Sequence, residues 1–419
     1  MDFAESLTWL EGLRRKSGIL PGTDRIRKVL SICGDPQEKL RVVHVAGTNG
    51  KGSVCAFLRA IALEAGYRVG VFSSPEPISV LQTITIDGAA IPSEAFAALC
   101  SEVRFVCEQN QIVLSEFEVI TVISLLCFYR ERCDLTIIEC GMGGAEDATN
   151  VFSSPLCCVL TAVSLDHTAF LGQTLAEIAR NKCGIIKNGS HVVTVQNQEE
   201  DVLEEIFSSA AEKGATVHFP SGNATICESN LNGTVFVLNE KRYHISLSGA
   251  FQVHNAQAAL EIVRVLSEKG FNFTGEDVQN GLDTAAIPCR QEVICRDPLC
   301  ILDGAHNVQG IKALAETVRF IAEKRPVIGL FGMLRDKDCA ACAAILAPLF
   351  EQVVCCAPEN PRALPADELA QLFEQNGTPA ASFSSLKEAL CKAKELATNK
   401  PLVVGGSFYL SYPVRELIK

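Results

Sequence analysis

The sequence predicts an α/β fold with two domains: a larger N-terminal domain built on a doubly wound parallel sheet, and a smaller, Rossmann-like C-terminal domain. Three observations predict it. Short apolar runs alternate with amphipathic stretches over most of the chain, which is typical of strands covered by helices. The 419 residues exceed what one ordinary core contains. The alternation changes near residue 240 and restarts after Pro288, so we place the domains at residues 1–288 and 289–419.

In the first domain, each expected strand ends in a loop that holds Gly, Ser, Asp or Asn. Ligands of such folds collect beyond the carboxyl ends of parallel strands. A hairpin that turns at Asn239 and Glu240 is expected over residues 234–246, and a helix over 252–269 continues the domain. The expected strands are residues 41–46, 68–72, 135–139 and 157–163, and the first helix is residues 51–65.

In the second domain, the same alternation gives four strands and four helices, and we expect the two domains to face a shared cleft. The expected strands are residues 300–302, 327–330, 352–356 and 402–404, and the expected helices are residues 309–323, 339–349, 366–375 and 385–396.

Composition excludes several classes of function. A net charge of −12 argues against a nucleic-acid partner, because phosphates require clustered Lys and Arg. The longest apolar stretch, residues 119–129, is too short to cross a membrane. Residues 1–15 carry three acidic side chains, unlike a signal peptide. We therefore expect a cytoplasmic monomer that binds small molecules.

The 19 cysteines lie singly within apolar strands and helices, which indicates reduced, buried thiols rather than a disulfide framework. Cys339 and Cys342 form one Cys-x-x-Cys pair, but no second pair stands at zinc-ribbon spacing. We expect both to pack in a core; a metal or redox role is the alternative.

The strongest chemical signal is the segment Ala-Gly-Thr-Asn-Gly-Lys-Gly-Ser at residues 46–53, which stands between a strand and a helix as a phosphate loop does. Its amides and the positive end of the helix suit phosphate oxygens, Lys51 adds a charge for the β- and γ-phosphates, and Ser53 suits Mg²⁺. The hydroxyl comes two residues after the lysine, and Val45 replaces the usual first glycine. A plain glycine-rich turn is the alternative. The expected ATP contacts are Gly47, Thr48, Asn49, Gly50, Lys51, Gly52 and Ser53.

Three further residues of the first domain are candidates at the same sheet edge. Glu139 ends a strand and runs into a glycine-rich turn, so it is either a hard oxygen ligand or a surface acid. His167 follows the next strand, where a lone histidine is usually structural. Lys182 lies in an apolar segment, where burial would lower its pKa and give a neutral amine; a surface lysine is the alternative.

In the second domain, the segment Asp303 to Asn307 follows a strand and presents an acid, an imidazole and an amide. Capping of the next helix by Asn307 is the alternative reading. Arg290, near the domain junction, either meets a phosphate or pairs with Glu292.

Taken together, these segments resemble folylpolyglutamate synthase and dihydrofolate synthase, members of the Mur ligase superfamily, in order and spacing over almost the whole chain. The bacterial bifunctional members are the most similar in length. The matching segments are residues 44–53, 73–75, 117–121, 139–150, 166–172, 182–187, 251–256, 290–292, 303–307, 335–338 and 406–407.

The resemblance implies an ATP- and Mg²⁺-dependent ligase that joins L-glutamate to dihydropteroate, to the γ-carboxylate of a folate, or to both. A substrate carboxylate would be phosphorylated by ATP, and the amine of glutamate would then displace phosphate. Lys182 would carry a carbamate that bridges to a second metal ion. The implied catalytic residues are Lys51, Glu139, His167 and Lys182; the implied metal ligands are Ser53, Ser73, Glu139, His167 and Lys182 as its carbamate; and the implied further nucleotide contacts are Asn255, Arg290, Asp303 and His306.

The sequence also departs from the family's pattern near the substrate. Glu76 and Pro77 stand where His and Leu are usual, Gln82 and Thr83 replace a Glu-Arg pair, and Ala145 replaces an arginine. Two alternatives therefore stay open: a Mur-type amide ligase that acts on a peptidoglycan precursor, and an ATP-binding homologue that has lost folate ligase activity.

Overall fold

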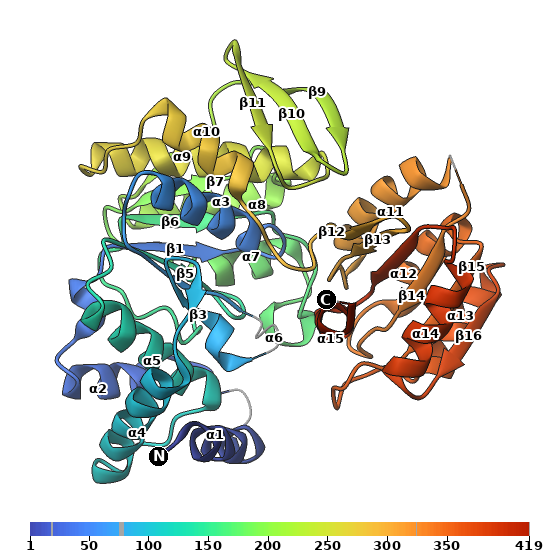
Figure 1. Ribbon diagram of the computed structural model, residues 1–419. Coiled ribbons are helices and arrows are strands. Elements are labelled where there is room, and N and C mark those ends of the chain that lie inside the picture. The colour runs from blue at the N-terminus through green and yellow to red at the C-terminus, as the bar shows by residue number, and fades with distance from the viewer. Residues whose placement is uncertain (18–19, 75–78, 324, 419) are drawn as a thin grey trace. The chain divides into compact units, whose positions relative to one another are not determined.

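The computed structural model describes residues 1–17, 20–74, 79–323 and 325–418 (Figure 1). Glu76 and Pro77 therefore lie outside the described residues. Contacts between residues divide the chain into two compact units, and each is described by itself. The first unit is Met1–Thr225, Phe236–Ser246 and Gln252–Ala285, and the second is Ile226–Val235, Leu247–Phe251 and Ala286–Lys419.

The first unit is built on an eight-stranded sheet with the order β4-β3-β2-β5-β1-β6-β7-β8. The strands from β2 to β8 in this order pair in parallel, whereas β3 and β4 form an antiparallel edge that was not expected. The strands are β1 (Val42–Ala46), β2 (Val69–Phe72), β3 (Ile84–Ile86), β4 (Ala89–Ala90), β5 (Leu135–Glu139), β6 (Cys157–Leu160), β7 (His191–Thr194) and β8 (Thr216–His218).

Helices cover both faces of this sheet, as a doubly wound fold requires. One face packs against two clusters of apolar side chains contributed by α1, α2, α4, α5, α7 and α8. Figure 1 shows α3, α9 and α10 on the other side. Every residue of β1 and β5 is buried, because helices cover both faces of the sheet, and the two strands are accordingly mostly apolar rather than alternating. The helices are α1 (Phe3–Ser17), α2 (Asp24–Ile32), α3 (Lys51–Glu64), α4 (Ser93–Gln109), α5 (Glu116–Arg130), α6 (Thr168–Leu171), α7 (Leu175–Cys183), α8 (Glu200–Glu212), α9 (Phe251–Glu268) and α10 (Gly275–Thr284).

The expected hairpin is confirmed. Strands β10 (Gly233–Leu238) and β11 (Lys241–Ile245) flank Asn239 and Glu240, whose φ angles of 49° and 65° suit a tight hairpin turn. A third strand, β9 (Thr225–Asn230), completes this small sheet and was not predicted, because its residues are mostly polar and exposed.

The second unit contains a six-stranded sheet with the order β12-β13-β17-β14-β15-β16. All its strand pairs are parallel except β12 with β13. The expected strands and helices are confirmed within a few residues, and β12, β16 and α15 were not predicted. The elements are β12 (Glu292–Arg296), β13 (Leu299–Leu302), β14 (Ile328–Phe331), β15 (Gln352–Cys356), β16 (Ala380–Phe383), β17 (Leu402–Gly405), α11 (Val308–Ala322), α12 (Cys339–Leu346), α13 (Ala366–Gln375), α14 (Leu386–Leu396) and α15 (Phe408–Ile418).

The Cys-x-x-Cys pair has the packing role that was expected. Cys339 and Cys342 belong to an apolar cluster of the second unit. Burial raises the pKa of the Cys339 thiol to about 11 and that of the Cys342 thiol to about 12. Such thiols are poor nucleophiles and poor metal ligands at neutral pH.

Among the described residues, no helix is both long and apolar enough to cross a bilayer.

The close packing of α10 on α3 gives a first testable prediction. A Cβ added at Gly281 would lie 2.4 Å from the Ile61 Cα atom, so the two helix backbones touch at this point. Replacing Gly281 by alanine is expected to lower the free energy of unfolding by about 1–3 kcal/mol, measured by urea denaturation.

Gly12 provides the matched control for that measurement. It lies in α1, and an added Cβ there meets no atom within 4 Å. Gly12→Ala is expected to raise stability by about 0.5–1 kcal/mol, because glycine costs more backbone entropy than alanine in a helix. Equal effects of the two substitutions would contradict the close contact at Gly281.

Candidate active site around the phosphate loop

The glycine-rich loop joins β1, which ends at Ala46, to α3, which begins at Lys51. Gly47 has a φ of 152° and Gly50 a φ of 91°, so both occupy backbone conformations that favour glycine. A Cβ at Gly47 would lie 1.9 Å from Thr161 Oγ1, and one at Gly50 would lie 2.4 Å from Asn255 Oδ1. The loop is therefore held closely by its neighbours, and Asn255 of α9 lies against it.

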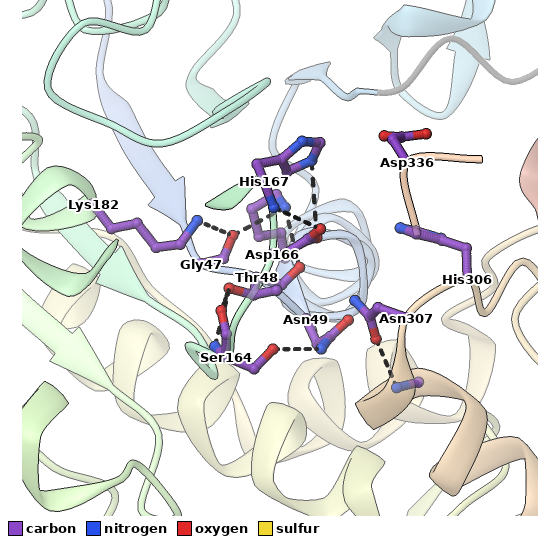
Figure 2. Close-up of polar contacts among 12 residues, drawn as sticks. Gly47, Thr48, Asn49, Ser164, Asp166, His167, Lys182, His306, Asn307 and Asp336 are labelled. Carbon is purple, nitrogen blue, oxygen red and sulfur yellow. Dashed lines mark hydrogen bonds and ion pairs between the residues drawn. The ribbon is translucent and has the colours of Figure 1, made fainter. Parts of the chain in front are cut away.

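A second segment, which follows β6, holds the first half of the loop. The backbone amides of Thr48 and Asn49 both donate to the Ala162 carbonyl, at 2.9 and 3.0 Å. The Thr48 hydroxyl donates to the Ser164 carbonyl and accepts from the Ser164 amide, each at 3.1 Å (Figure 2). Sequence reasoning missed Ala162 and Ser164 because tertiary contacts alone reveal them.

The donors of the second half of the loop belong to the first turn of α3. The amides of Lys51, Gly52 and Ser53 have no acceptor within the helix, because a helix leaves its first N–H groups unpaired. These amides and the positive end of the helix dipole make an anion site. Phosphate contacts are thus expected from this half rather than from Thr48 and Asn49.

The Lys51 ammonium lies over the loop. Its Nζ donates to the Gly47 carbonyl at 3.2 Å and to the Thr48 carbonyl at 3.4 Å, and it is 3.9 Å from Glu139 Oε1. Glu139 is the last residue of β5 and pairs in register with Val45 of β1. The parallel sheet therefore brings this buried carboxylate to the phosphate loop, as the sequence predicted.

Lys182 lies in the last turn of α7, is buried, and donates from Nζ to the Gly47 carbonyl at 2.9 Å (Figure 2). It therefore shares that carbonyl with Lys51. Burial, and then the charge of Lys51, lower the pKa of Lys182 to about 7. A substantial fraction of the amine is neutral at pH 7, as was expected if Lys182 is buried.

His167 and Ser73 stand at the ends of other strands of the same sheet. His167 follows β6 with a left-handed φ of 49°, its Nε2 atom is 3.8 Å from Asp166 Oδ2, and its amide donates to Asp166 Oδ1 at 2.9 Å. Ser73 follows β2, and its amide donates to the carbonyl of Thr83 at 3.0 Å. Thr83 is one of the departures from the family's pattern. Its side chain is buried, and its backbone carbonyl supports Ser73 through this hydrogen bond.

The donor set fits Mg²⁺ that enters with ATP. Among the described residues, no three His, Cys, Asp or Glu side chains are gathered into a metal cluster. Mg²⁺ usually takes one or two carboxylates and completes its shell with water and phosphate oxygens, so such a cluster is not required. The hydroxyl of Ser53 and the carboxylate of Glu139 are both buried at the loop and are the hard oxygen donors that this ion prefers.

The turn after β5 packs against α7 and fixes the position of Lys182. Ala145 donates its amide to the Asn181 carbonyl at 2.8 Å, and a Cβ at Gly144 would lie 2.6 Å from the Lys182 carbonyl oxygen. Asp147 accepts from the Met142 amide at 2.8 Å and so closes the turn. Ala145 itself is exposed.

Beside this turn lies a pocket of about 300 Å³. Its wall is mostly apolar and includes the rings of Phe117 and Phe170. Two buried acceptor atoms at this pocket, Glu118 Oε1 and Asn181 Oδ1, have no hydrogen-bond partner in the described part of the chain. Glu118 is instead balanced by an ion pair with Arg25 at 3.2 Å.

In the second unit, the candidate residues gather around Phe408. The Arg290 guanidinium lies 4.7 Å from the centre of the Phe408 ring, and the His306 ring centre lies 6.1 Å from it. The suggested pairing of Arg290 with Glu292 was wrong, because Glu292 binds Arg415 at 2.8 Å. Phe408 was not identified from the sequence, where nothing marks it as different from other core aromatics.

Asp303 is buried and accepts from the Gln291 amide at 3.0 Å and the Ala305 amide at 2.5 Å. Burial raises the pKa of this carboxyl, and nearby Arg290 opposes the rise. His306 donates from Nδ1 to the Gly304 carbonyl at 2.8 Å. Asn307 caps α11 by accepting from the Gly310 amide at 2.8 Å, as one reading of the sequence predicted.

Two family models match the chain: the Mur ligase middle domain over residues 45–263, and the Mur ligase, glutamate ligase domain over residues 289–408. The chain is 32% identical to the dihydrofolate synthase/folylpolyglutamate synthase of Bacillus subtilis, over 100% of this chain and 99% of that protein. It is 30% identical to the Escherichia coli protein of the same name, over 99% and 95%.

Solved structures agree with this similarity. A Mycobacterium tuberculosis folylpolyglutamate synthase complexed with ADP and AMPPCP matches with a TM-score of 0.90 and 29% identity, over 100% of this chain and 99% of that one. E. coli FolC in complex with DHPP and ADP matches with a TM-score of 0.89 and 28% identity, over the same shares. The chain therefore belongs to the dihydrofolate synthase/folylpolyglutamate synthase family of Mur ligases.

Proposed function

We propose that this chain uses MgATP to join L-glutamate to dihydropteroate, to the γ-carboxylate of a folate, or to both. The observation that carries the proposal is the arrangement at the phosphate loop, where Lys51, Lys182 and Glu139 meet around Gly47 beside the first turn of α3. This arrangement suits the transfer of a phosphoryl group to a carboxylate. A site that binds ATP without transferring its phosphate does not require the second, buried lysine, Lys182.

The proposed reaction has two steps. One oxygen of the acceptor carboxylate attacks the γ-phosphorus in line, which breaks the bond to the β-phosphate oxygen and releases ADP. The amine of glutamate then attacks the acyl carbon, the C–O bond to phosphate breaks, and the amide forms as the nitrogen loses its proton. Lys51 and the amides of Gly52 and Ser53 neutralise the charge that develops on the transferred group.

We assign Mg²⁺ to Ser53, Ser73, Glu139, His167 and the carbamate of Lys182. When bound, the metal neutralises phosphate oxygens and orients them for attack. A Yersinia pestis relative of 30% identity has been solved with AMPPNP and a Mn ion, which supports a divalent metal in this family. A neutral Lys182 amine would add CO₂ and lose a proton, which would convert the neutral amine into a carbamate anion suited to a metal.

The pocket beside the glycine turn is the proposed acceptor site. A pteridine is flat and aromatic, which suits the rings of Phe117 and Phe170, and it carries amino and ring N–H donors. Asn181 Oδ1, which has no hydrogen-bond partner in the described part of the chain, would accept from such a donor. The DHPP complex of the E. coli relative supports this class of ligand.

The proposal assigns residues 1–288 to the ATP-binding domain and residues 289–419 to a second α/β domain. Further nucleotide contacts are proposed for Asn255 and, in the second domain, for Arg290, Asp303 and His306. The partners are small molecules, namely ATP, L-glutamate and the pterin acceptor. That the protein acts in the cytoplasm as a monomer, without nucleic acid or membrane, stays a prediction.

An isotope experiment tests the proposed route. Dihydropteroate with both carboxylate oxygens replaced by ¹⁸O is incubated with the protein, MgATP and L-glutamate. One ¹⁸O atom is expected in the released phosphate and one in the new amide, measured by mass spectrometry. Amide formation accompanied by unlabelled phosphate would rule out attack of the carboxylate on ATP.

A further inference from the structure

A second pocket, of about 440 Å³, lies in the first unit where α7 and α8 end. Its wall includes three cationic side chains, Arg180, Lys187 and Lys213, against one carboxylate, Glu212. The whole chain carries a net charge of −12. This local excess of positive charge therefore contrasts with the net negative charge of the chain. It also lies outside the phosphate loop.

Lys187 is the distinctive member of this group. Its half-buried ammonium donates to Asn150 Oδ1 at 2.6 Å, and in the described part of the chain no carboxylate lies within ion-pair distance of it or of Lys213. Burial, followed by the charges of Arg27 and Lys213, lowers the pKa of Lys187. Holding cations together in this way costs free energy unless an anion neutralises them.

Helix dipoles account for only part of the cluster. Arg180 lies in the last turn of α7 and Lys213 follows the last residue of α8, so each charge stabilises the negative end of a helix. Arg180 is also held by Glu205 at 2.6 Å. Neither explanation applies to Lys187, which lies in the loop after α7 and whose ammonium, among the described residues, has the neutral oxygen of Asn150 as its hydrogen-bond partner.

The rest of the wall supplies neutral hydrogen-bond donors. Ser209 of α8 offers a hydroxyl and Asn188 offers a side-chain amide. Ammonium groups beside hydroxyl and amide donors suit the oxygens of a phosphate group. We propose that this pocket is a second anion site that binds a phosphate group, either as inorganic phosphate or as part of a small phosphorylated molecule. The proposal does not depend on the ligase reaction.

Hydrogen bonds connect this site to the helix that carries Lys182. The Asn150 oxygen accepts from Lys187, and its Nδ2 atom donates to the carbonyls of Ala145 at 2.9 Å and Gly184 at 3.1 Å. Ala145 in turn donates its amide to the Asn181 carbonyl. An anion held by Lys187 therefore restrains residues 181–187, whose amide hydrogen exchange is expected to slow on binding.

Calorimetry on the full chain tests the site. The protein is saturated with Mg²⁺ and AMPPCP so that the phosphate loop is filled, and inorganic phosphate or glycerol 3-phosphate is then titrated in. At least one of the two is expected to bind. Lys213→Glu and the milder Ser209→Ala are each expected to weaken this binding, Lys213→Glu by about tenfold or more.

Lys394→Glu is the control, because Lys394 is an exposed lysine of α14 in the second unit. It makes the same change of charge and is expected to leave binding unchanged. Binding of inorganic phosphate, with or without glycerol 3-phosphate, assigns the site to free phosphate, and binding of glycerol 3-phosphate alone assigns it to phosphorylated molecules. The proposal is overturned if neither ligand binds at millimolar concentration, or if Lys213→Glu binds as tightly as Lys394→Glu.

Discussion

Replacing Lys51 by alanine is expected to lower turnover by about 10²- to 10³-fold or more while the fold stays intact. The ammonium lies over the phosphate loop, where it donates to the carbonyl oxygens of Gly47 and Thr48 and lies 3.9 Å from Glu139 Oε1. Its charge would therefore be lost from the place where the β- and γ-phosphates are proposed to bind. ADP release under saturating ATP measures the effect.

Lys51→Arg separates charge from geometry. Arginine keeps the positive charge but spreads it over a planar fork that does not match a compact ammonium, so only partial activity is expected. Lys28→Ala is the control, because Lys28 is an exposed residue of α2. A Lys51→Ala protein with normal thermal stability and more than about a tenth of the wild-type turnover would contradict the role of Lys51 in phosphoryl transfer.

Replacing Lys182 by alanine is the second substitution with a large expected effect. We expect a loss of about 10²-fold or more in turnover, because the proposed carbamate would no longer be present to bind the metal. Short carboxylic acids such as acetate are expected to restore part of the activity, since they supply an anionic carboxylate in the space left by the side chain. Full activity without added acid would refute the carbamate.

The pH dependence of the wild-type protein gives an independent test of the same residue. The neutral Lys182 amine is the form that adds CO₂, and the pKa of Lys182 is about 7. Activity at limiting bicarbonate is therefore expected to rise as the pH is raised through 7, and to decrease as the pH is lowered below 7. Lys182→Ala supplemented with acetate should not show this response to bicarbonate.

The sequence was most informative where strands are buried on both faces. Strands β1 and β5 are fully buried runs of mostly apolar residues, so their positions followed from hydrophobicity alone. The polar, exposed strand β9 has no such signal, and β12 is an antiparallel addition that the βα alternation does not include. Tertiary pairing fixes both of these strands, and local sequence pattern does not.

The candidate site shows the same division. Parallel strands place their carboxyl ends together, so Glu139 was expected near the loop once the strand order was assumed. The sequence left a buried and a surface position open for Lys182, and the structure shows that it is buried. The contacts of the loop with Ala162 and Ser164 depend on packing between distant segments, as do those of Phe408 with Arg290 and His306. The catalytic and ligand-binding roles themselves stay predictions.

The measurement that tests the central claim most directly is ADP release by the purified protein with MgATP and L-glutamate. Dihydropteroate, a reduced folate monoglutamate and a muramyl peptidoglycan precursor are compared as acceptors. We expect turnover that requires glutamate with at least one of the two pterin acceptors and none with the muramyl precursor. Activity with the muramyl precursor alone, or ATP binding without turnover on any acceptor, would contradict the assignment of this chain as a folate glutamate ligase.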